Sequence, residues 1–415
     1  QFDIIQRNHL PDFVEVFLID APLPDTPAEM SLSCSSEADN NAALIGILNS
    51  SKGNSGTPVK ETVATPAFSV ASGAVNSGTS VTITCSTEGA KIYYTKDGTA
   101  PTASSTEYKA AISVTAAVTL KAIAVKSGMN DSVVASVSYT ISSGNIPEGF
   151  VEVKGTTITG NESWTPSSEV FVSGRSITIP DMYVCDHEVT QAEYEKYCKY
   201  GSSSPSSGYG VGENYPAYYV NWYDAIVYCN LRSIDEGLTP AYKIGEETDP
   251  RKWSGIVGDS ENGYCGPSSS NSTWNSLTYD KEAKGYRLPT EAEWEYIAWE
   301  AGTSTTTYSG SNTIDDVAWY SSNSSSKNHE VKGKKANSLG IYDMSGNVYE
   351  WCYDWYGTVS STTADTGASS GSLRVPRGGS WGSSASLCAV SNRSVDYPGY
   401  RNNLCGFRVV RSSSK

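Results

Sequence analysis

Cysteine and histidine are the residues of this chain best suited to metal or nucleophilic chemistry. The sequence of 415 residues holds nine cysteines, and its histidines are His9, His187 and His329. No two cysteines form a close Cys-x-x-Cys pair, which is the usual spacing in a structural zinc site. We therefore expect no structural zinc site. The odd number of cysteines leaves at least one thiol free or modified.

The segment 382–405 has a composition suited to binding. It is rich in Ser, Gly, Asn and Tyr, and it holds no Trp, Met, Lys, Gln or Glu. Tyr provides contact area at low entropic cost, while small polar residues adapt to a ligand. Tyr397 and Tyr400, on either side of Pro398, are the expected anchors. The other positions predicted on this ligand-binding face are Gly382, Ser383, Ser384, Ser386, Leu387, Ala389, Ser391, Val395, Asp396, Gly399, Leu404 and Cys405.

Four arginines in this region have two interpretations. Arg393, Arg401, Arg408 and Arg411 lie among few acidic residues, so they could form a patch that binds anions. For Arg408 and Arg411 we favour a framework role, in which they pair with core carboxylates or donate to loop carbonyls.

Three helices are predicted where a capping box precedes apolar residues at helical spacing. The pairs are Thr190 with Glu193, Asn221 with Asp224, and Thr290 with Glu293. After Trp299 the sequence predicts little helix, and its long loops rich in Ser and Asn need buried aromatic side chains to hold them. The candidates are Trp222, Trp294, Trp351 and Trp381.

Composition changes divide the chain into three parts. Residues 1–61 indicate a disordered leader or tether. Within 62–143, the segments 80–85, 90–95, 119–125 and 134–141 alternate apolar with polar residues, which predicts a small antiparallel β-sandwich. The stretch 142–145 is the expected boundary, and residues 146–415 indicate a mixture of short helices and long loops.

The charge balance excludes some classes of partner. Against 30 Lys and Arg stand 45 Asp and Glu, a net charge of −15. Nucleic acid and anionic membrane surfaces both attract basic faces, so neither is expected as the main partner. The low charged fraction, 18%, favours a secreted or surface-displayed bacterial protein. No apolar run is long enough for a membrane-spanning helix.

Residues 30–34, Met-Ser-Leu-Ser-Cys, resemble the lipid-attachment box of a bacterial lipoprotein, which implies an anchor at Cys34. The preceding segment 11–25 is acidic and rich in Pro, unlike an apolar signal core. Lipidation at Cys34 and a leader without such a role therefore remain alternatives. In both cases we expect an extracellular or cell-surface location.

The run 92–101, Ile-Tyr-Tyr-Thr-Lys-Asp-Gly-Thr-Ala-Pro, resembles the immunoglobulin-like domain at the C-terminus of chitobiase and hexosaminidase enzymes. The resemblance implies an accessory spacer; a carbohydrate-binding role is the alternative.

A series of motifs in the last part of the chain resembles the formylglycine-generating-enzyme family, a subclass of the C-type lectin fold. The matching segments are 188–194, 220–225, 285–296, 337–351, 377–381 and 406–408, in the order of the family. The resemblance implies an α+β fold of the C-type lectin type, preceded by the immunoglobulin-like sandwich. Fold alone does not give function.

The enzymes of that family oxidise a substrate cysteine with copper held by a Cys-x-x-x-x-Cys pair shortly after Gly-Gly-Ser. The corresponding positions here are Ser383 and Cys388. A hydroxyl cannot replace a thiolate for Cu(I), so the resemblance implies a lost copper site unless Cys405 substitutes. Cys388 and Cys405 could instead form a disulfide, be small buried residues, or be surface thiols.

Family members also bind calcium in one turn, and the matching positions are the carboxylates of Asp343 and Glu350 and the backbone oxygens of Gly346 and Val348. Hard oxygen ligands suit calcium. The alternative is that both carboxylates only cap backbone amides. A structural calcium is the one cofactor we consider, and none is required.

The segment 382–405 also resembles the variable region of proteins diversified by retroelements, which copy a template with errors at adenines. The five residue types that it does not contain are those that an NNC codon cannot encode, and NNC is what an AAC codon becomes when its adenines are randomised. A variable region of about 374–411 lies, as in those proteins, around a fixed Arg-Gly-Gly-Ser-Trp at 377–381 and Gly-Phe-Arg at 406–408. Recognition loops in general are also poor in Lys and Glu.

Together these features predict a non-catalytic binding protein, not an enzyme, whose diversified C-terminal loops recognise a protein or peptide on another cell or host. The alternatives are a copper-dependent cysteine-oxidising enzyme and a carbohydrate-binding adhesin.

Overall fold

The computed structural model describes residues 4–9, 15–19, 60–142, 146–165 and 168–413. The chain divides into two compact units, Gln1–Lys60 and Glu61–Lys415. In the first unit, strand β1 (Ile4–His9) pairs antiparallel with β2 (Glu15–Ile19), so these parts of the expected leader hold secondary structure. Both segments contain β-branched or aromatic residues, which favour strands. Cys34 lies outside the described residues.

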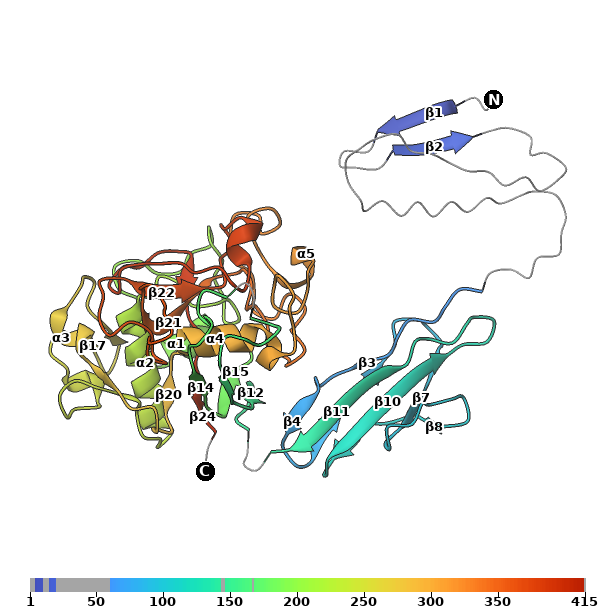
Figure 1. The fold of residues 1–415 in the computed structure, drawn as a ribbon, viewed down its shortest axis with the longest axis horizontal. Helices are drawn as coiled ribbons and strands as arrows, with labels where there is room; N and C mark the ends of the chain where they lie inside the picture. Colours follow the sequence, from blue (N-terminus) through green and yellow to red (C-terminus); the bar gives the residue numbers. More distant parts are fainter. Residues whose placement is uncertain (1–3, 10–14, 20–59, 143–145, 166–167, 414–415) are drawn as a thin grey trace. The chain divides into compact units, whose positions relative to one another are not determined.

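The sandwich domain, which we define as residues 62–142, is built from short, mostly antiparallel strands around an apolar core, with one parallel pair between segments 73–75 and 139–141. Five strands in the order β4-β11-β10-β7-β8 are part of a nine-stranded sheet that continues from β4 into the next domain, and β3-β6 and β5-β9 form two further pairs. Leu120, Ala122 and Tyr139 are buried between the sheets. The strands are β3 (Ala67–Phe68), β4 (Gly73–Val75), β5 (Thr79–Val81), β6 (Ile83–Thr84), β7 (Lys91–Thr95), β8 (Thr106–Glu107), β9 (Ile112–Val114), β10 (Val118–Val125) and β11 (Ala135–Ile141) (Figure 1). All four predicted strand segments are confirmed.

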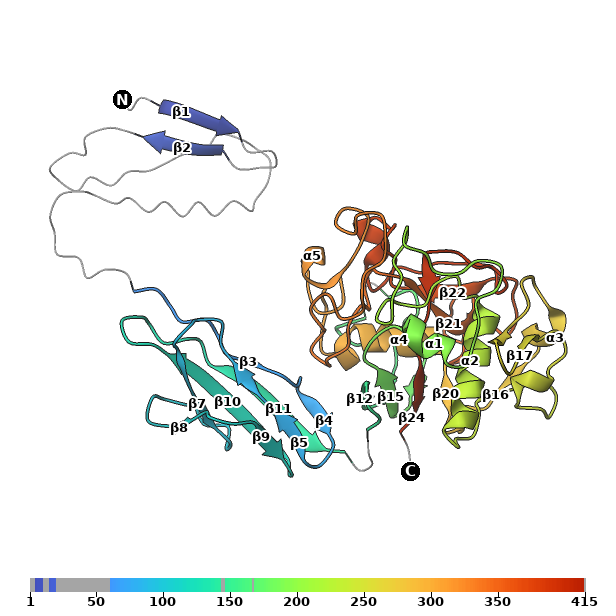
Figure 2. The same ribbon diagram turned by 180° about the vertical axis from the view of Figure 1, so that it is seen from behind.

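The head domain, described at residues 146–165 and 168–413, contributes a four-strand part to a nine-stranded sheet, joined to the rest of it through β12 and β4, and also has a three-stranded sheet and three two-stranded pairs. The four-strand part has the order β20-β24-β15-β12, so the first and last strands of this domain are in one sheet, and the three-stranded sheet has the order β22-β21-β23. Its strands are β12 (Phe150–Val153), β13 (Thr156–Ile158), β14 (Ile177–Ile179), β15 (Met182–Cys185), β16 (Tyr242–Lys243), β17 (Val257–Asp259), β18 (Gly263–Cys265), β19 (Thr278–Tyr279), β20 (Tyr286–Arg287), β21 (Tyr349–Trp355), β22 (Arg374–Arg377), β23 (Cys405–Gly406) and β24 (Val410–Ser412). Long loops make up most of the head around β21 and β22, as both views show (Figures 1 and 2).

The helices of the head domain are few and short. They are α1 (Gln191–Glu195), α2 (Trp222–Asp235), α3 (Ser272–Asn275), α4 (Glu291–Ala298) and α5 (Ile314–Val317). All three predicted capping boxes are confirmed, because Thr190, Asn221 and Thr290 each accept from the backbone N–H three residues on, and that residue's carboxylate accepts from the cap. After Trp299 the one α-helix in the described residues is α5, as expected. Within the described residues, no helix combines the length and apolar character needed to cross a membrane.

Two apolar cores support the loops of the head, one around α2 and one around α4. Trp222, Trp294 and Trp351 are fully buried, and Trp381 is half-buried. The indole N–H of each of these tryptophans has a hydrogen-bond partner. Three donate to backbone carbonyls: Trp222 to Cys352 at 3.0 Å, Trp351 to Val220 at 2.9 Å and Trp381 to Asn403 at 3.0 Å. The fourth, Trp294, donates to Glu350 Oε2 at 2.7 Å. Burial of large rings with bonded polar tips fixes these irregular loops.

Candidate functional site

The segment 382–405 is held at both ends by the three-stranded sheet. It follows β22 and leads into β23, and these strands flank β21 on opposite sides. Between β22 and the segment, Gly378 and Gly379 have φ angles of +89° and +77°, which favour glycine. A Cβ on Gly379 would lie 2.6 Å from Cys388 Sγ, so this close approach also requires glycine.

Hydrogen bonds to the backbone hold the segment and the residue that precedes it. The Trp381 N–H donates to the Asn347 carbonyl at 2.7 Å, and Ser345 Oγ donates to the Cys388 carbonyl at 2.9 Å. Further along, Arg374 and Asp396 exchange backbone bonds of 2.8 and 3.1 Å. The segment is irregular in secondary structure but bound to the fold at several points, which limits the entropy lost on binding a ligand.

Several large hydrophobic side chains of this segment are exposed. Of the nine exposed large hydrophobic side chains in the described residues, four lie between positions 387 and 400. They are Leu387 (40% exposed), Val395 (41%), Tyr397 (61%) and Tyr400 (54%). Gly382, Ser384 and Ser386 are also exposed, whereas Ala389, Ser391, Asp396 and Leu404 are half-buried. We call the exposed residues 382, 384, 386, 387, 395, 397 and 400 the C-terminal face.

Three residues predicted on this face are buried, so the prediction is wrong for them. Ser383 is 5% exposed, and its hydroxyl accepts from the Ser380 N–H at 3.0 Å. Gly399 packs so closely that a Cβ would lie 2.7 Å from the Ser269 carbonyl carbon. Cys405 begins the pairing with β21 and lies in the core around α2. Contacts with distant parts of the chain, which the local composition does not reveal, account for all three.

The four arginines belong to the framework, so the anion patch is wrong. Arg408 is fully buried and binds Glu350 through two hydrogen bonds of 2.6 and 2.7 Å. Arg411 lies over the rings of Tyr183 and Tyr286. The two arginines inside the segment are also paired: Arg401 binds Asp224 through two bonds of 2.7 Å, and Arg393 binds Glu291 in the same way.

The residues at the positions that match the family's copper ligands do not suit a soft cation. The Ser383 hydroxyl lies 3.1 Å from the Ser380 hydroxyl and donates to Tyr349 at 3.3 Å. Burial raises the pKa of the Cys388 thiol to about 12, and that of Cys405 well above its usual value. Cu(I) requires thiolates, which burial disfavours at both positions. All cysteines in the described residues are free, so Cys388 and Cys405 form no disulfide and are small buried residues.

The expected calcium ligands share one turn, but protein donors hold both carboxylates. Asp343 accepts from the Lys332 N–H at 2.7 Å, and Glu350 is bound by Arg408 and the Trp294 indole. This arrangement favours the alternative in which the carboxylates stabilise the protein itself. Because Arg408 holds both oxygens of Glu350, the set offered by Asp343, Gly346, Val348 and Glu350 does not fit calcium well. Calcium at this turn stays a prediction.

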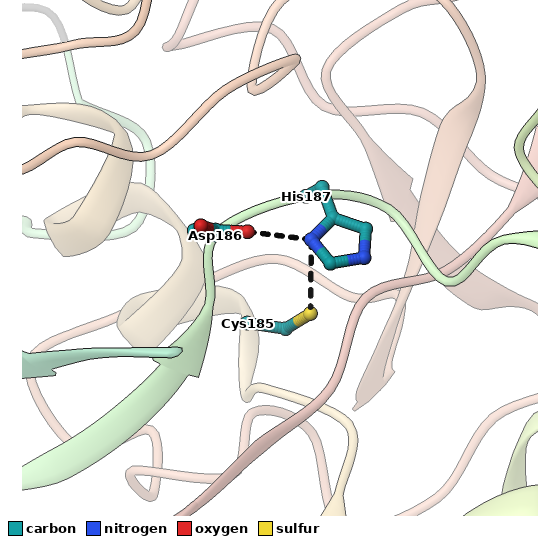
Figure 3. Close-up of side chains that lie close together, drawn as sticks. All are labelled: Cys185, Asp186 and His187. Carbon is teal, nitrogen blue, oxygen red and sulfur yellow. Dashed lines mark hydrogen bonds and ion pairs between the residues drawn. The ribbon is translucent and has the colours of Figure 1, made fainter. Parts of the chain in front are cut away.

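A different cluster lies outside the Cys-x-x-Cys spacing from which metal sites are predicted. Cys185, Asp186 and His187 follow one another in the sequence, and one donor atom of each lies within 4.8 Å of the others (Figure 3). Burial lowers the pKa of His187, but Cys185, Asp186 and Glu193 outweigh this effect and raise it to about 12. In the sequence, the cluster is indicated only by three consecutive residues whose side chains can each bind a metal ion, through sulfur, oxygen and nitrogen.

Known proteins similar to this chain share parts of this architecture. Residues 70–136 match the chitobiase/beta-hexosaminidase C-terminal domain. The solved structure of Treponema denticola variable protein 1 is 32% identical, with a TM-score of 0.50, and the match covers 68% of this chain and 96% of that protein. Chaperone protein LppX of Paenibacillus barcinonensis is 39% identical over 270 residues, which cover 59% of this chain and 85% of LppX.

The formylglycine-generating enzyme of Streptomyces coelicolor is 33% identical over 162 residues, which cover 34% of this chain and about half, 51%, of that enzyme. The expected fold is confirmed: an α+β head of the C-type lectin type follows an immunoglobulin-like domain. Because residues 140–413, most of the chain, match the sulfatase-modifying factor enzyme 1-like domain, the chain belongs to this family.

Proposed function

We propose that this protein is a non-catalytic binding protein of the bacterial cell surface, and that its C-terminal face recognises a protein or peptide. The observation that supports this function best is the exposure of Leu387, Val395, Tyr397 and Tyr400 on one short segment. Exposed large hydrophobic side chains normally occur singly on a soluble protein, and groups of them mark interaction sites. Tyr is also among the residues that contribute most to binding energy at protein interfaces.

The charges around the face favour a neutral ligand surface. Arg393 and Arg401 are the basic side chains of the segment, and both bind buried carboxylates. They are therefore not free to neutralise a phosphate or a carboxylate of a ligand. A partner that offers apolar side chains and backbone amides suits tyrosine rings and serine hydroxyls.

The framework beneath the C-terminal face is suited to a surface on which the exposed side chains vary between copies of the protein. The strands, the glycine turn and the buried tryptophans belong to the framework, whereas the side chains of the face are exposed to solvent. We therefore propose that retroelement-type diversification changes the face without loss of the fold, and that the sandwich domain is a spacer. A lipid anchor at Cys34 belongs to the same proposal.

Peptide selection tests the binding function. A phage library of random peptides is selected on the immobilised full chain, and the affinity of recovered peptides is measured. The variant Tyr397→Ser/Tyr400→Ser is compared with the control Val211→Ser/Val257→Ser, since Val211 and Val257 are 53% and 51% exposed but lie outside the segment. We expect the tyrosine variant to weaken binding by at least about tenfold, because an anchor at an interface contributes more than about 1 kcal/mol. Equal affinities for both variants would contradict the proposal.

A copper-dependent enzyme is the second candidate, favoured by the 33% identity to the formylglycine-generating enzyme of Streptomyces coelicolor. Titration with Cu(I) followed by a peptide-oxidation assay separates the two functions. We expect neither stoichiometric copper binding nor oxidation. Tight copper binding that Cys388→Ser abolishes would establish the enzyme instead. Binding on a glycan array that Tyr397→Ser/Tyr400→Ser abolishes would favour the adhesin.

A further inference from the structure

A cluster of three metal-ligand types lies at the end of strand β15. This strand ends at Cys185, and the chain continues through Asp186 and His187 toward α1. The sulfur of Cys185 and the nearer oxygen of Asp186 both face Nδ1 of His187, at 3.7 and 2.5 Å, as the two dashed lines in Figure 3 show. Among the described residues, this is the one group of three or more Cys, His, Asp or Glu ligand atoms that converge in this way.

The spacing of sulfur and nitrogen fits a tetrahedral ion. With zinc–sulfur and zinc–nitrogen bonds of about 2.3 and 2.0 Å, the two ligand atoms are about 3.5 Å apart. The observed separation of Cys185 Sγ and His187 Nδ1 is 3.7 Å. The Asp186 oxygen accepts a hydrogen bond from the protonated ring. An ion in the place of that proton requires a small rotation of the Asp186 carboxylate away from Nδ1.

A second carboxylate orients the imidazole. Nε2 of His187 lies 3.3 Å from Glu193 Oε2. Glu193 is itself fixed, because its carboxylate accepts from the Thr190 N–H at 2.9 Å in the capping box of α1. A carboxylate that accepts from one ring nitrogen while the other binds metal is a common arrangement around protein-bound zinc. It holds Nδ1 toward the sulfur.

Burial and charge also suit a cation. Cys185 is fully buried, while the side chains of Asp186 and His187 are 19% and 13% exposed, which leaves a path from solvent. Asp186 and Glu193 provide negative charge. Lys332 contacts both oxygens of Asp186, at 2.7 and 2.9 Å, but its side chain is 37% exposed, unlike the buried Arg408 at Glu350, so its ammonium can move into solvent when an ion binds the carboxylate. A divalent ion bound by the Cys185 thiolate, the Asp186 carboxylate and a neutral His187 forms an electrically neutral group.

We propose that Cys185, Asp186 and His187 bind a divalent cation of borderline softness, with zinc as the best fit. Sulfur, imidazole nitrogen and carboxylate oxygen are the ligand types that zinc takes, and a water completes four-coordination. Binding releases the ring proton and, where the thiol is protonated, a second proton. The site is separate from the C-terminal face, and its role is to fix the connection between β15 and α1.

Metal binding by the full chain tests the site. The chain is treated with a chelator, dialysed against zinc, and its metal content is measured; cobalt then replaces zinc for spectroscopy. Thiolate ligation gives a sulfur-to-cobalt charge-transfer absorption, which carboxylate ligands do not produce. His187→Gln removes one ligand and leaves Cys185 in the core, and Cys185→Ser removes the sulfur. Cys85→Ser is the control, because Cys85 is half-buried in the sandwich domain and donates to the Ala64 carbonyl.

In the unmodified protein and in Cys85→Ser we expect one zinc per chain and a thiolate–cobalt absorption. In His187→Gln we expect the loss of the bound zinc and of this absorption. The affinity of that variant is expected to fall by more than the roughly 10- to 100-fold typical for loss of an outer partner. Circular dichroism shows whether each variant is folded. If Cys185→Ser does not fold, the result for His187→Gln alone tests the site. Failure of the unmodified chain to retain zinc, or retention unchanged in His187→Gln, would overturn the proposal.

Discussion

At the scale of residues, buried ion pairs stabilise the framework behind the C-terminal face. Arg401 is 5% exposed and Asp224 is fully buried, so each needs the other in place of water. Asp224 also accepts from the N–H groups of Asn221 and Gly266, which join it to the start of α2. Removing one partner of such a pair leaves a buried charge without compensation.

Arg401→Met is therefore expected to destabilise the head by about 3–5 kcal/mol. The matched control is Arg251→Met, since Arg251 pairs with Asp249 while 44% exposed and an exposed pair is worth about 0–1 kcal/mol. Denaturant unfolding of the two variants measures both free energies. Equal losses would show that Arg401 contributes no more than a surface arginine.

Asp354 gives the stability of the protein a dependence on pH. Burial, together with the neighbouring Glu291, raises its pKa to about 8, although its Oδ2 accepts from the Glu291 N–H at 2.8 Å. The folded protein thus holds a proton that the unfolded chain releases near pH 4. The stabilisation is fully present below about pH 4 and is lost as pH rises through about 8.

Asp354→Asn, which keeps an acceptor for the Glu291 N–H, is expected to flatten this dependence. One proton accounts for at most about 1.4 kcal/mol of unfolding free energy per pH unit. Unfolding curves between pH 4.5 and 8.5, a range set by these two pKa values, compare the variant with the unmodified chain. A variant that loses stability with rising pH as steeply as the unmodified protein would refute this role of Asp354.

At the scale of elements, the sequence predicted the helices and strands that depend on interactions between residues close together in the chain. The three capping boxes placed the starts of α1, α2 and α4, because a cap and its carboxylate lie three residues apart. The strands of the sandwich domain were predicted from the alternation of apolar and polar residues. The burial of Ser383 and Gly399 could not be predicted in this way, since the residues that cover Gly399 lie about Ser269, far away in the sequence. The donors around His187 were overlooked because adjacent residues at a strand end are not a known ligand spacing.

The glycine turn before the C-terminal face, Gly378 and Gly379, packs closely against Cys388. Gly379→Ala introduces a Cβ at positive φ and 2.6 Å from Cys388 Sγ, whereas Gly237→Ala has a similar φ of +69° with no atom within 4 Å. We expect Gly237→Ala to cost about 1 kcal/mol from backbone conformation alone, and Gly379→Ala to cost clearly more and to weaken peptide binding. Thermal unfolding and the binding assay compare them. Equal costs would show that the close approach to Cys388 is not needed.

At the scale of the whole molecule, an acidic protein presents an uncharged, tyrosine-containing face on a tightly bonded framework. The net charge of −15 opposes binding to nucleic acid, and the buried serine and thiols oppose copper chemistry. We propose that the exposed residues of 382–405 are a binding surface whose composition is changed by diversification. Such variation is tolerated where a side chain contacts solvent, since core positions accept few replacements.

Sequencing of the encoding DNA in many descendants of one cell tests this claim most directly, together with the search for a nearby near-identical template repeat. We predict substitutions at template adenines, concentrated in the codons for exposed residues such as Ser384, Leu387, Tyr397 and Tyr400, with few surviving at the buried Ser383, Cys388 and Cys405. An invariant segment without a template, or substitutions spread equally over exposed and buried codons and over all four bases, would contradict this proposal.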